Sequence, residues 1–125
     1  MRRTVLVVDD DAATCRLYAG MLGGEHDVIT ADSGLAAVEQ VEAHAIDLVI
    51  MDLNMPGLDG WMAISLIRAR RPALPFLIAT SNMDPGLEQR ARQAGAAGFL
   101  RKPVSAASLR QAVSRALPPD PTAPQ

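Results

Sequence analysis

The chain has 125 residues, which is enough for one domain with one substantial hydrophobic core. Its hydrophobic content of 49%, charged content of 21% and net charge of −2, with scattered basic residues, give no reason to expect nucleic acid or an anionic membrane as a partner. No apolar stretch approaches the roughly 18 residues of a membrane span, and the start of the chain lacks a signal-peptide core, so we expect a cytoplasmic location.

Short apolar runs alternate along the chain with segments of helical period. Runs that are almost continuously apolar are typical of strands buried on both faces of a parallel sheet. Glycine, proline and capping residues mark the ends of the helical segments. In chain order we predict a strand at 4–8, a helix at 12–22, a strand at 27–31, a helix at 35–43, a strand at 47–51, a helix at 61–70, a strand at 74–79, a helix opened by an Asp84 cap and Pro85 and closed at Gly95, a strand at 98–101, and a helix capped by Ser105 that ends before Pro118.

Apolar stripes on these helices predict which side chains are buried. The first helix places Ala13, Leu17, Tyr18 and Met21 near one stripe, and the third carries Ala63, Leu66 and Ile67 at i, i+3 and i+4. Cys15 is the only cysteine, so no internal disulfide can form, and we interpret it as a small buried helix residue.

Strict alternation of strand and helix favours a doubly wound α/β domain. Right-handed crossovers with short loops suit a five-stranded parallel sheet of order 2-1-3-4-5. In that order the chain leaves strand 1 in opposite directions toward strands 2 and 3, so a crevice opens between the C-terminal ends of strands 1 and 3. We therefore expect the chemistry at that edge of the sheet.

Polar residues follow the strands at that edge: Asp9 and Asp10, Asp52, Thr80, and Lys102. Taken singly, each has a structural explanation, since one of Asp9, Asp10 and Asp11 could cap the first helix and the others could be turn or surface residues. Taken together, three carboxylates, a hydroxyl and a lysine on one edge indicate a site.

Electrostatics indicates what such a site would hold. Ionised carboxylates about 5 Å apart repel by roughly 3 kcal/mol per pair at an effective dielectric near 20, so the cluster needs a cation. Oxygen ligands without a nearby cysteine or histidine favour Mg²⁺. A cation beside a carboxylate, a hydroxyl and a lysine suits phosphoryl transfer, with Asp52 as the nucleophile that forms an aspartyl phosphate.

With these motifs the chain resembles the receiver domain of two-component response regulators, including the chemotaxis regulators. The resemblance covers residues 3–117 and rests on VLVVDDD at 5–11, DLVIMDLNMPGLDG at 47–60, LIATS at 77–81 and AAGFLRKPV at 96–104. It implies a flavodoxin-like (βα)5 domain over residues 1–117, followed by a proline-rich tail or linker at 118–125. Residue by residue, it implies metal binding by Asp9, Asp10, Asp52 and the backbone carbonyl of Asn54, phosphorylation of Asp52, phosphoryl binding and switching by Thr80, Ser81, Lys102 and Phe99, and a candidate cis peptide bond at Pro103.

The resemblance also implies partners. A histidine kinase or histidine phosphotransfer protein would supply the phosphoryl group, and the face made by helix 4, strand 5 and helix 5 would bind an output protein or a second copy of the chain. We expect a signalling domain that carries out only its own phosphorylation and dephosphorylation. A Mg²⁺-dependent phosphatase with an aspartyl nucleophile is the alternative, but that class needs a second acid two residues after the first, where this chain has Asn54.

Overall fold

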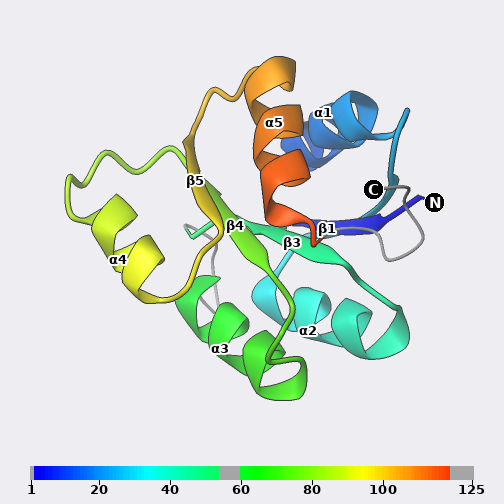
Figure 1. Cartoon of the computed structure of the whole chain (residues 1–125), viewed down its shortest axis with the longest axis horizontal. Helices are drawn as coiled ribbons and strands as arrows, with labels where there is room; N and C mark the ends of the chain where they lie inside the picture. The colour runs from blue at the N-terminus through cyan, green and yellow to red at the C-terminus, as the bar shows by residue number, and fades with distance from the viewer. Residues whose placement is uncertain (1, 54–59, 119–125) are drawn as a thin grey trace.

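The computed structural model describes residues 2–53 and 60–118. It contains ten elements that alternate strictly between strand and helix (Figure 1). They are β1 (Thr4–Val8), α1 (Ala12–Leu22), β2 (Asp27–Ala31), α2 (Gly34–Ala43), β3 (Leu48–Met51), α3 (Gly60–Arg70), β4 (Phe76–Thr80), α4 (Leu87–Gln93), β5 (Gly98–Arg101) and α5 (Ala106–Ala116).

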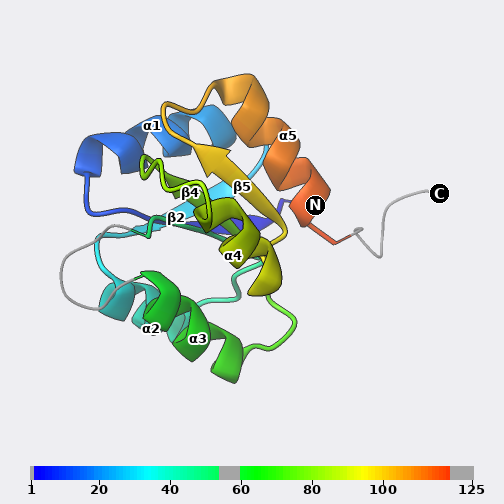
Figure 2. The same ribbon diagram turned by 90° about the vertical axis from the view of Figure 1, so that its left-hand side faces the viewer.

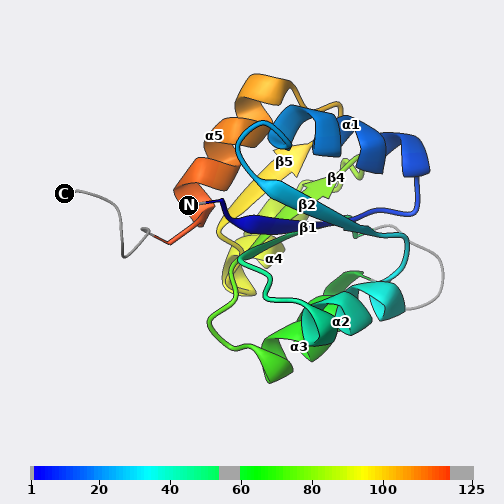
Figure 3. The ribbon, with the colours of Figure 1, turned by 90° about the vertical axis from the view of Figure 1, so that its right-hand side faces the viewer.

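The five strands form one parallel sheet in the order β2-β1-β3-β4-β5, which confirms the predicted topology. Helices α1 and α5 cover one face, and α2, α3 and α4 cover the other, as the two side views show (Figures 2 and 3). Two hydrophobic clusters fill the space between sheet and helices, one on each face. The sheet is therefore buried on both sides, which explains the nearly continuous apolar strands.

Strand boundaries differ from the prediction at two places for identifiable reasons. Asp47 precedes β3: its backbone N–H donates to the Thr4 carbonyl oxygen, but the Thr4 N–H donates to the Asp47 side chain at 2.8 Å and not to a backbone carbonyl of a neighbouring strand. Strand β4 begins at Phe76 because the Leu74 N–H closes a turn onto the Arg71 carbonyl oxygen and Pro75 has no N–H to donate. Thr80 is then the last residue of β4, paired with Arg101 of β5.

Helix α4 is shorter than predicted, and its expected cap was wrong. The Asp84 carboxylate accepts from the Gly86 N–H at 2.9 Å within a turn, so the helix begins only at Leu87 and has no side-chain cap. Its end matches the prediction, because Gly95 adopts a φ of +94°, a conformation that glycine reaches without strain. Ser33 and Ser105 cap α2 and α5 through their hydroxyl groups.

The predicted buried stripe of α1 was also wrong in part. Cys15, Tyr18 and Leu22 face the core, whereas Leu17 is 55% exposed. On α3, Ala63 and Ile67 are buried as predicted, but Ile64 takes the place expected for Leu66, which is 37% exposed. Cys15 is buried, as its interpretation as a packing residue requires.

Candidate functional site

The C-terminal ends of β1 and β3 lie side by side and bring Asp9 and Asp52 to one edge of the sheet. Val8 pairs with Met51, and the Asp52 N–H donates to the Val8 carbonyl oxygen at 3.0 Å. Asp9 and Asp52 are buried, with 2% and 6% exposed, while Asp10 faces solvent. Each of these three side chains offers a carboxylate oxygen within 4.8 Å of the others.

The third aspartate of the run has a different role, because Asp11 is the N-cap of α1. Its carboxylate accepts from the Ala13 N–H and from the Thr14 hydroxyl, both at 3.0 Å. These hydrogen bonds, that of Thr14 first, lower the pKa of Asp11 from its usual value. Asp11 therefore caps the helix, whereas Asp9 and Asp10 lie near Asp52.

Lys102 provides the positive charge of the site. Its Nζ donates to Asp9 Oδ2 at 2.5 Å and lies 3.5 Å from Asp52 Oδ2. Partial burial of the ammonium group lowers the pKa of Lys102, but its hydrogen bond to Asp9 and the charges of Asp52 and Asp9 outweigh that effect and leave the pKa raised. The Lys102–Pro103 peptide bond is cis. Lys102 is also the only lysine in the sequence.

Thr80 ends β4 with a fully buried side chain, and its hydroxyl oxygen accepts from the Asn82 N–H at 3.1 Å. Ser81 is exposed and lines a hollow of about 360 Å³ together with Lys102 and Pro103. These residues lie along the same edge, beyond Asp52, because β4 and β5 follow β3 in the sheet.

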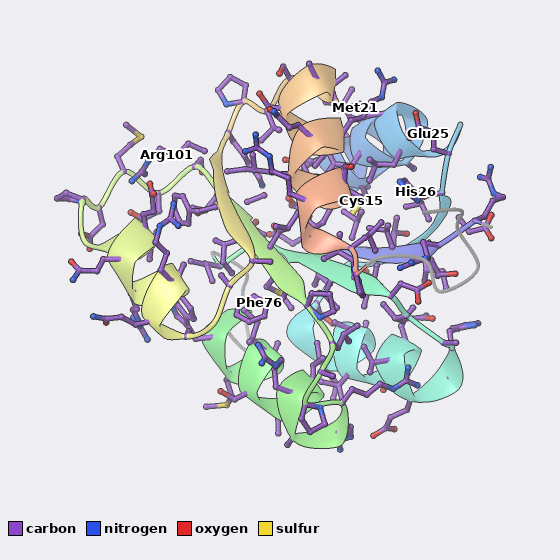
Figure 4. The ribbon with its side chains drawn as sticks, viewed as in Figure 1. Cys15, Met21, Glu25, His26, Phe76 and Arg101 are labelled. Carbon is purple, nitrogen blue, oxygen red and sulfur yellow. The ribbon has the colours of Figure 1, made fainter. Side chains whose placement is uncertain are left out.

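Phe99 lies on the edge strand β5, partly buried against the cluster beneath α2, α3 and α4. The Arg101 guanidinium lies 5.0 Å from the centre of the Phe99 ring, and its Nη1 donates to the Asn82 carbonyl oxygen at 2.7 Å. Arg101, which Figure 4 labels, therefore connects the Phe99 ring to the loop that follows Thr80. No signal in the sequence indicates the contacts of Arg101 with the Phe99 ring and the Asn82 carbonyl oxygen.

Two further residues, Gly60 and Cys15, contact the backbone of Asp52 and Asp9, and the sequence did not predict either contact. Gly60 begins α3 against the backbone of Asp52, since a Cβ atom there would lie 2.6 Å from the Asp52 carbonyl oxygen. The Cys15 thiol donates to the Asp9 carbonyl oxygen at 3.3 Å, and burial raises its pKa above the usual value. Both contacts follow from the packing of helices onto strand ends, which no sequence motif encodes.

The donor set fits a hard divalent cation. Three carboxylates converge, two of them buried, and carboxylate oxygens are the ligands that Mg²⁺ prefers. His26 directly precedes β2 and His44 directly follows α2, and neither belongs to the cluster. Asn54, predicted to contribute its carbonyl oxygen, lies outside the described residues.

A doubly wound sheet with an acidic cluster, a hydroxyl and a lysine at its switch point defines the class of phosphorylation-activated receiver domains. The family model for the response regulator receiver domain matches residues 5–114, and the chain belongs to this family of two-component signalling domains. Nothing in the comparisons supports the phosphatase alternative.

Individual relatives agree with this assignment. The response regulator protein FleR of Pseudomonas aeruginosa is 39% identical over 116 residues, which is 92% of this chain and 24% of FleR. The transcriptional regulatory protein PdtaR of Mycobacterium tuberculosis is 40% identical over 117 residues, 92% of this chain and 57% of PdtaR. The chain thus spans only part of these relatives.

Among solved structures, the chemotaxis protein CheY4 of Vibrio cholerae superposes with a TM-score of 0.87 at 28% identity, over 94% of this chain and 100% of CheY4. The flavodoxin-like prediction is confirmed by this similarity together with the strand order. None of the helices in the described part of the chain has the length and apolarity needed to cross a membrane.

Proposed function

We propose that this domain accepts a phosphoryl group on Asp52 from a phosphohistidine of a histidine kinase or histidine phosphotransfer protein. A carboxylate oxygen of Asp52 would attack phosphorus, a P–O bond would form as the P–N bond breaks, and the imidazole would leave. The observation that carries the proposal is the position of Lys102, whose Nζ lies within 3.5 Å of oxygens of both Asp9 and Asp52. There its charge can stabilise the phosphoryl oxygens.

Asp9, Asp10 and Asp52 would hold Mg²⁺, with the Asn54 carbonyl oxygen as a further ligand. When bound, the ion would neutralise charge on the phosphoryl oxygens. The side chains would have the other roles. Asp52 would attack phosphorus, Lys102 would bind one phosphoryl oxygen, and the hydroxyl of Thr80 or Ser81 would donate a hydrogen bond to another.

The output would come from the face formed by α4, β5 and α5, with Phe99, Arg101, Met83 and Glu88 as contact residues for an output protein or a second copy. Two observations support this. Arg101 joins the Phe99 ring to the loop after Thr80, and Met83 in that loop is 74% exposed. A Thr80 hydroxyl drawn toward a phosphoryl group on Asp52 would shift this loop and the ring together.

The chain would then act as a phosphoacceptor that does not turn over an external substrate, and it would be located in the cytoplasm. The receiver domain would comprise residues 1–117, with 118–125 as a tail or linker. The C-cap of α5 at Leu117 supports that boundary.

Phosphorylation is tested with acetyl phosphate and Mg²⁺, followed by intact-protein mass spectrometry. We expect one phosphoryl group per chain, its loss in Asp52→Asn, and its retention in Asp32→Asn, which removes an exposed carboxylate that follows β2 on the same edge. Retention of the label in Asp52→Asn would refute the assignment.

Lys102 permits a second test, because reductive methylation with ¹³C-formaldehyde labels only this side chain and the N-terminal amine while keeping the charge. Adding beryllofluoride and Mg²⁺ should move the Lys102 methyl signal in the wild type and leave it in place in Asp52→Asn. An unmoved signal in the wild type, with beryllofluoride bound, would exclude a phosphoryl contact by Lys102.

The switch is tested with Thr80→Ala, against Thr30→Ala on the exposed side of β2 as the matched control. In Thr80→Ala, beryllofluoride should still shift the amides near Asp52, whereas the shifts at Phe99 and Arg101 should shrink. Full distal shifts in this variant would show that coupling bypasses Thr80.

A further inference from the structure

A groove lies between α3 and α4, on the face of the sheet opposite α1 and α5. It encloses a hollow of about 530 Å³. Helix α3 contributes Trp61, Ser65 and Arg68 to its walls, and α4 contributes Arg90 and Ala94 just past its end. Figure 2 shows the two helices next to each other beneath the β4 and β5 side of the sheet.

Two guanidinium groups in this groove lie over aromatic rings. Arg90 lies 4.5 Å from the centre of the Trp61 ring, and Arg68 lies 5.3 Å from the centre of the Phe76 ring. Figure 4 labels Phe76 on β4, above α3. A cation–π contact of this kind does not use up the N–H donors of the guanidinium in hydrogen bonds, so they can still bind a carboxylate.

Neither Arg68 nor Arg90 forms an ion pair with a carboxylate in the described part of the chain. Their neighbours on the same helices do: Arg70 pairs with Glu42, and Arg92 pairs with Glu88. Within the described residues, the two arginines that face the groove thus have no carboxylate partner, whereas the arginines two positions further along the same helices do.

Arg68 also reaches across the groove. Its Nη1 lies 3.4 Å from the position that a Cβ atom on Gly95 would occupy, so the side chain extends from α3 to the end of α4. Two cations are therefore held in place before any ligand arrives, which lowers the entropy lost on binding. Between them, Trp61 and Ile64 supply an apolar surface.

We propose that this groove binds an acidic segment of a partner protein, with carboxylates on Arg68 and Arg90 and an apolar side chain against Trp61. A carboxylate matches the forked donors of a guanidinium in two parallel hydrogen bonds. The net charge of −2 and the flanking Glu88 disfavour a nucleic acid at this surface. The groove lies between α4 and α3, whereas Phe99 and Arg101 of the proposed output face lie on β5, and binding in the groove does not depend on Asp52.

The test is a titration of the ¹⁵N-labelled full chain with a blocked peptide of alternating glutamate and leucine, monitored at the Trp61 indole and the Gly95 amide. We expect saturable shifts at both. Arg68→Gln and Arg90→Gln should each weaken binding by about tenfold or more, because each removes a charge-assisted pair. Arg115→Gln, an exposed arginine on α5, makes the same charge change and should alter binding by less than about twofold.

Three outcomes would overturn the proposal. One is equal binding of the peptide with glutamine in place of glutamate, and another is equal weakening in Arg115→Gln, which would show attraction by net charge alone. The third is binding of a single-stranded oligonucleotide at Trp61 and Gly95 under conditions in which the glutamate peptide does not bind.

Discussion

Replacing Lys102 by methionine tests whether this side chain is the counterion of the acidic cluster. At an effective dielectric near 20, the contacts of its Nζ with Asp9 at 2.5 Å and with Asp52 at 3.5 Å correspond to roughly 7 and 5 kcal/mol of Coulomb attraction. The cost of removing the ammonium from water offsets most of this. Loss of one partner from a buried pair costs about 3–5 kcal/mol, and since the Lys102 side chain is 20% exposed we expect about 2–3 kcal/mol.

For a chain of this length, that loss should lower the melting temperature in EDTA by roughly 8–12 °C. Mg²⁺ should restore part of the stability, because it would neutralise the carboxylates that Lys102 contacts in the wild type, and the affinity for Mg²⁺ should rise by about tenfold in Lys102→Met. Calorimetry with and without Mg²⁺ measures both effects, and Arg115→Met, on the exposed side of α5, is the matched control. A metal-free Lys102→Met protein that melts with the wild type would refute the counterion argument.

Asp10→Ala should weaken Mg²⁺ binding by about tenfold or more, which calorimetric titration measures, and unchanged affinity would place the ion elsewhere. Relief of carboxylate repulsion in the same variant should stabilise the metal-free fold by about 1 kcal/mol, which thermal melting measures. Gly95→Ala should destabilise the fold by about 1 kcal/mol or more, because φ is +94° there. Gly20→Ala, in open space on α1, should stabilise it by about 0.5–1 kcal/mol, so equal effects of the two changes in urea denaturation would contradict the conformational reason. Burial raises the pKa of the Cys15 thiol and leaves it 7% exposed, so it should react with a thiol reagent only as the protein unfolds, and rapid native labelling would be contrary evidence.

The fold could be predicted because local and global signals agree at nearly every element. Apolar runs give strands, serine caps such as Ser33 and Ser105 give helix starts, and strict alternation leaves few topologies. The wrong prediction that Leu17 of α1 is buried shows that an apolar period does not decide which of two adjacent residues faces the core. Leu17 and Tyr18 are neighbours in sequence, and although leucine is the more apolar of the two, the direction from which α5 and the sheet approach decides that Tyr18 is buried.

The site could be predicted less completely than the fold. Strand ends place Asp9, Asp52 and Lys102 on one edge by topology alone. The partner that Lys102 takes is a question of side-chain reach and packing, and the sequence did not indicate the 2.5 Å contact with Asp9. The wrong prediction of Asp84 as a helix cap has a similar cause. An aspartate that caps a helix and one that forms a turn can have the same local sequence, and they differ only in the conformation of the backbone that follows.

The contact between Lys102 and Asp9 implies that two events at this edge are coupled. Asp9 is almost fully buried and holds the ammonium of Lys102 more closely than Asp52 does. A divalent cation on Asp9 would compete with Lys102 for the same carboxylate, while a phosphoryl group on Asp52 would offer Lys102 new oxygen partners. We therefore expect Lys102 to leave Asp9 most readily when both are present, so that metal binding and phosphoryl binding would support each other. By linkage, any interaction that holds Lys102 on Asp9 would weaken the binding of both the metal ion and the phosphoryl group.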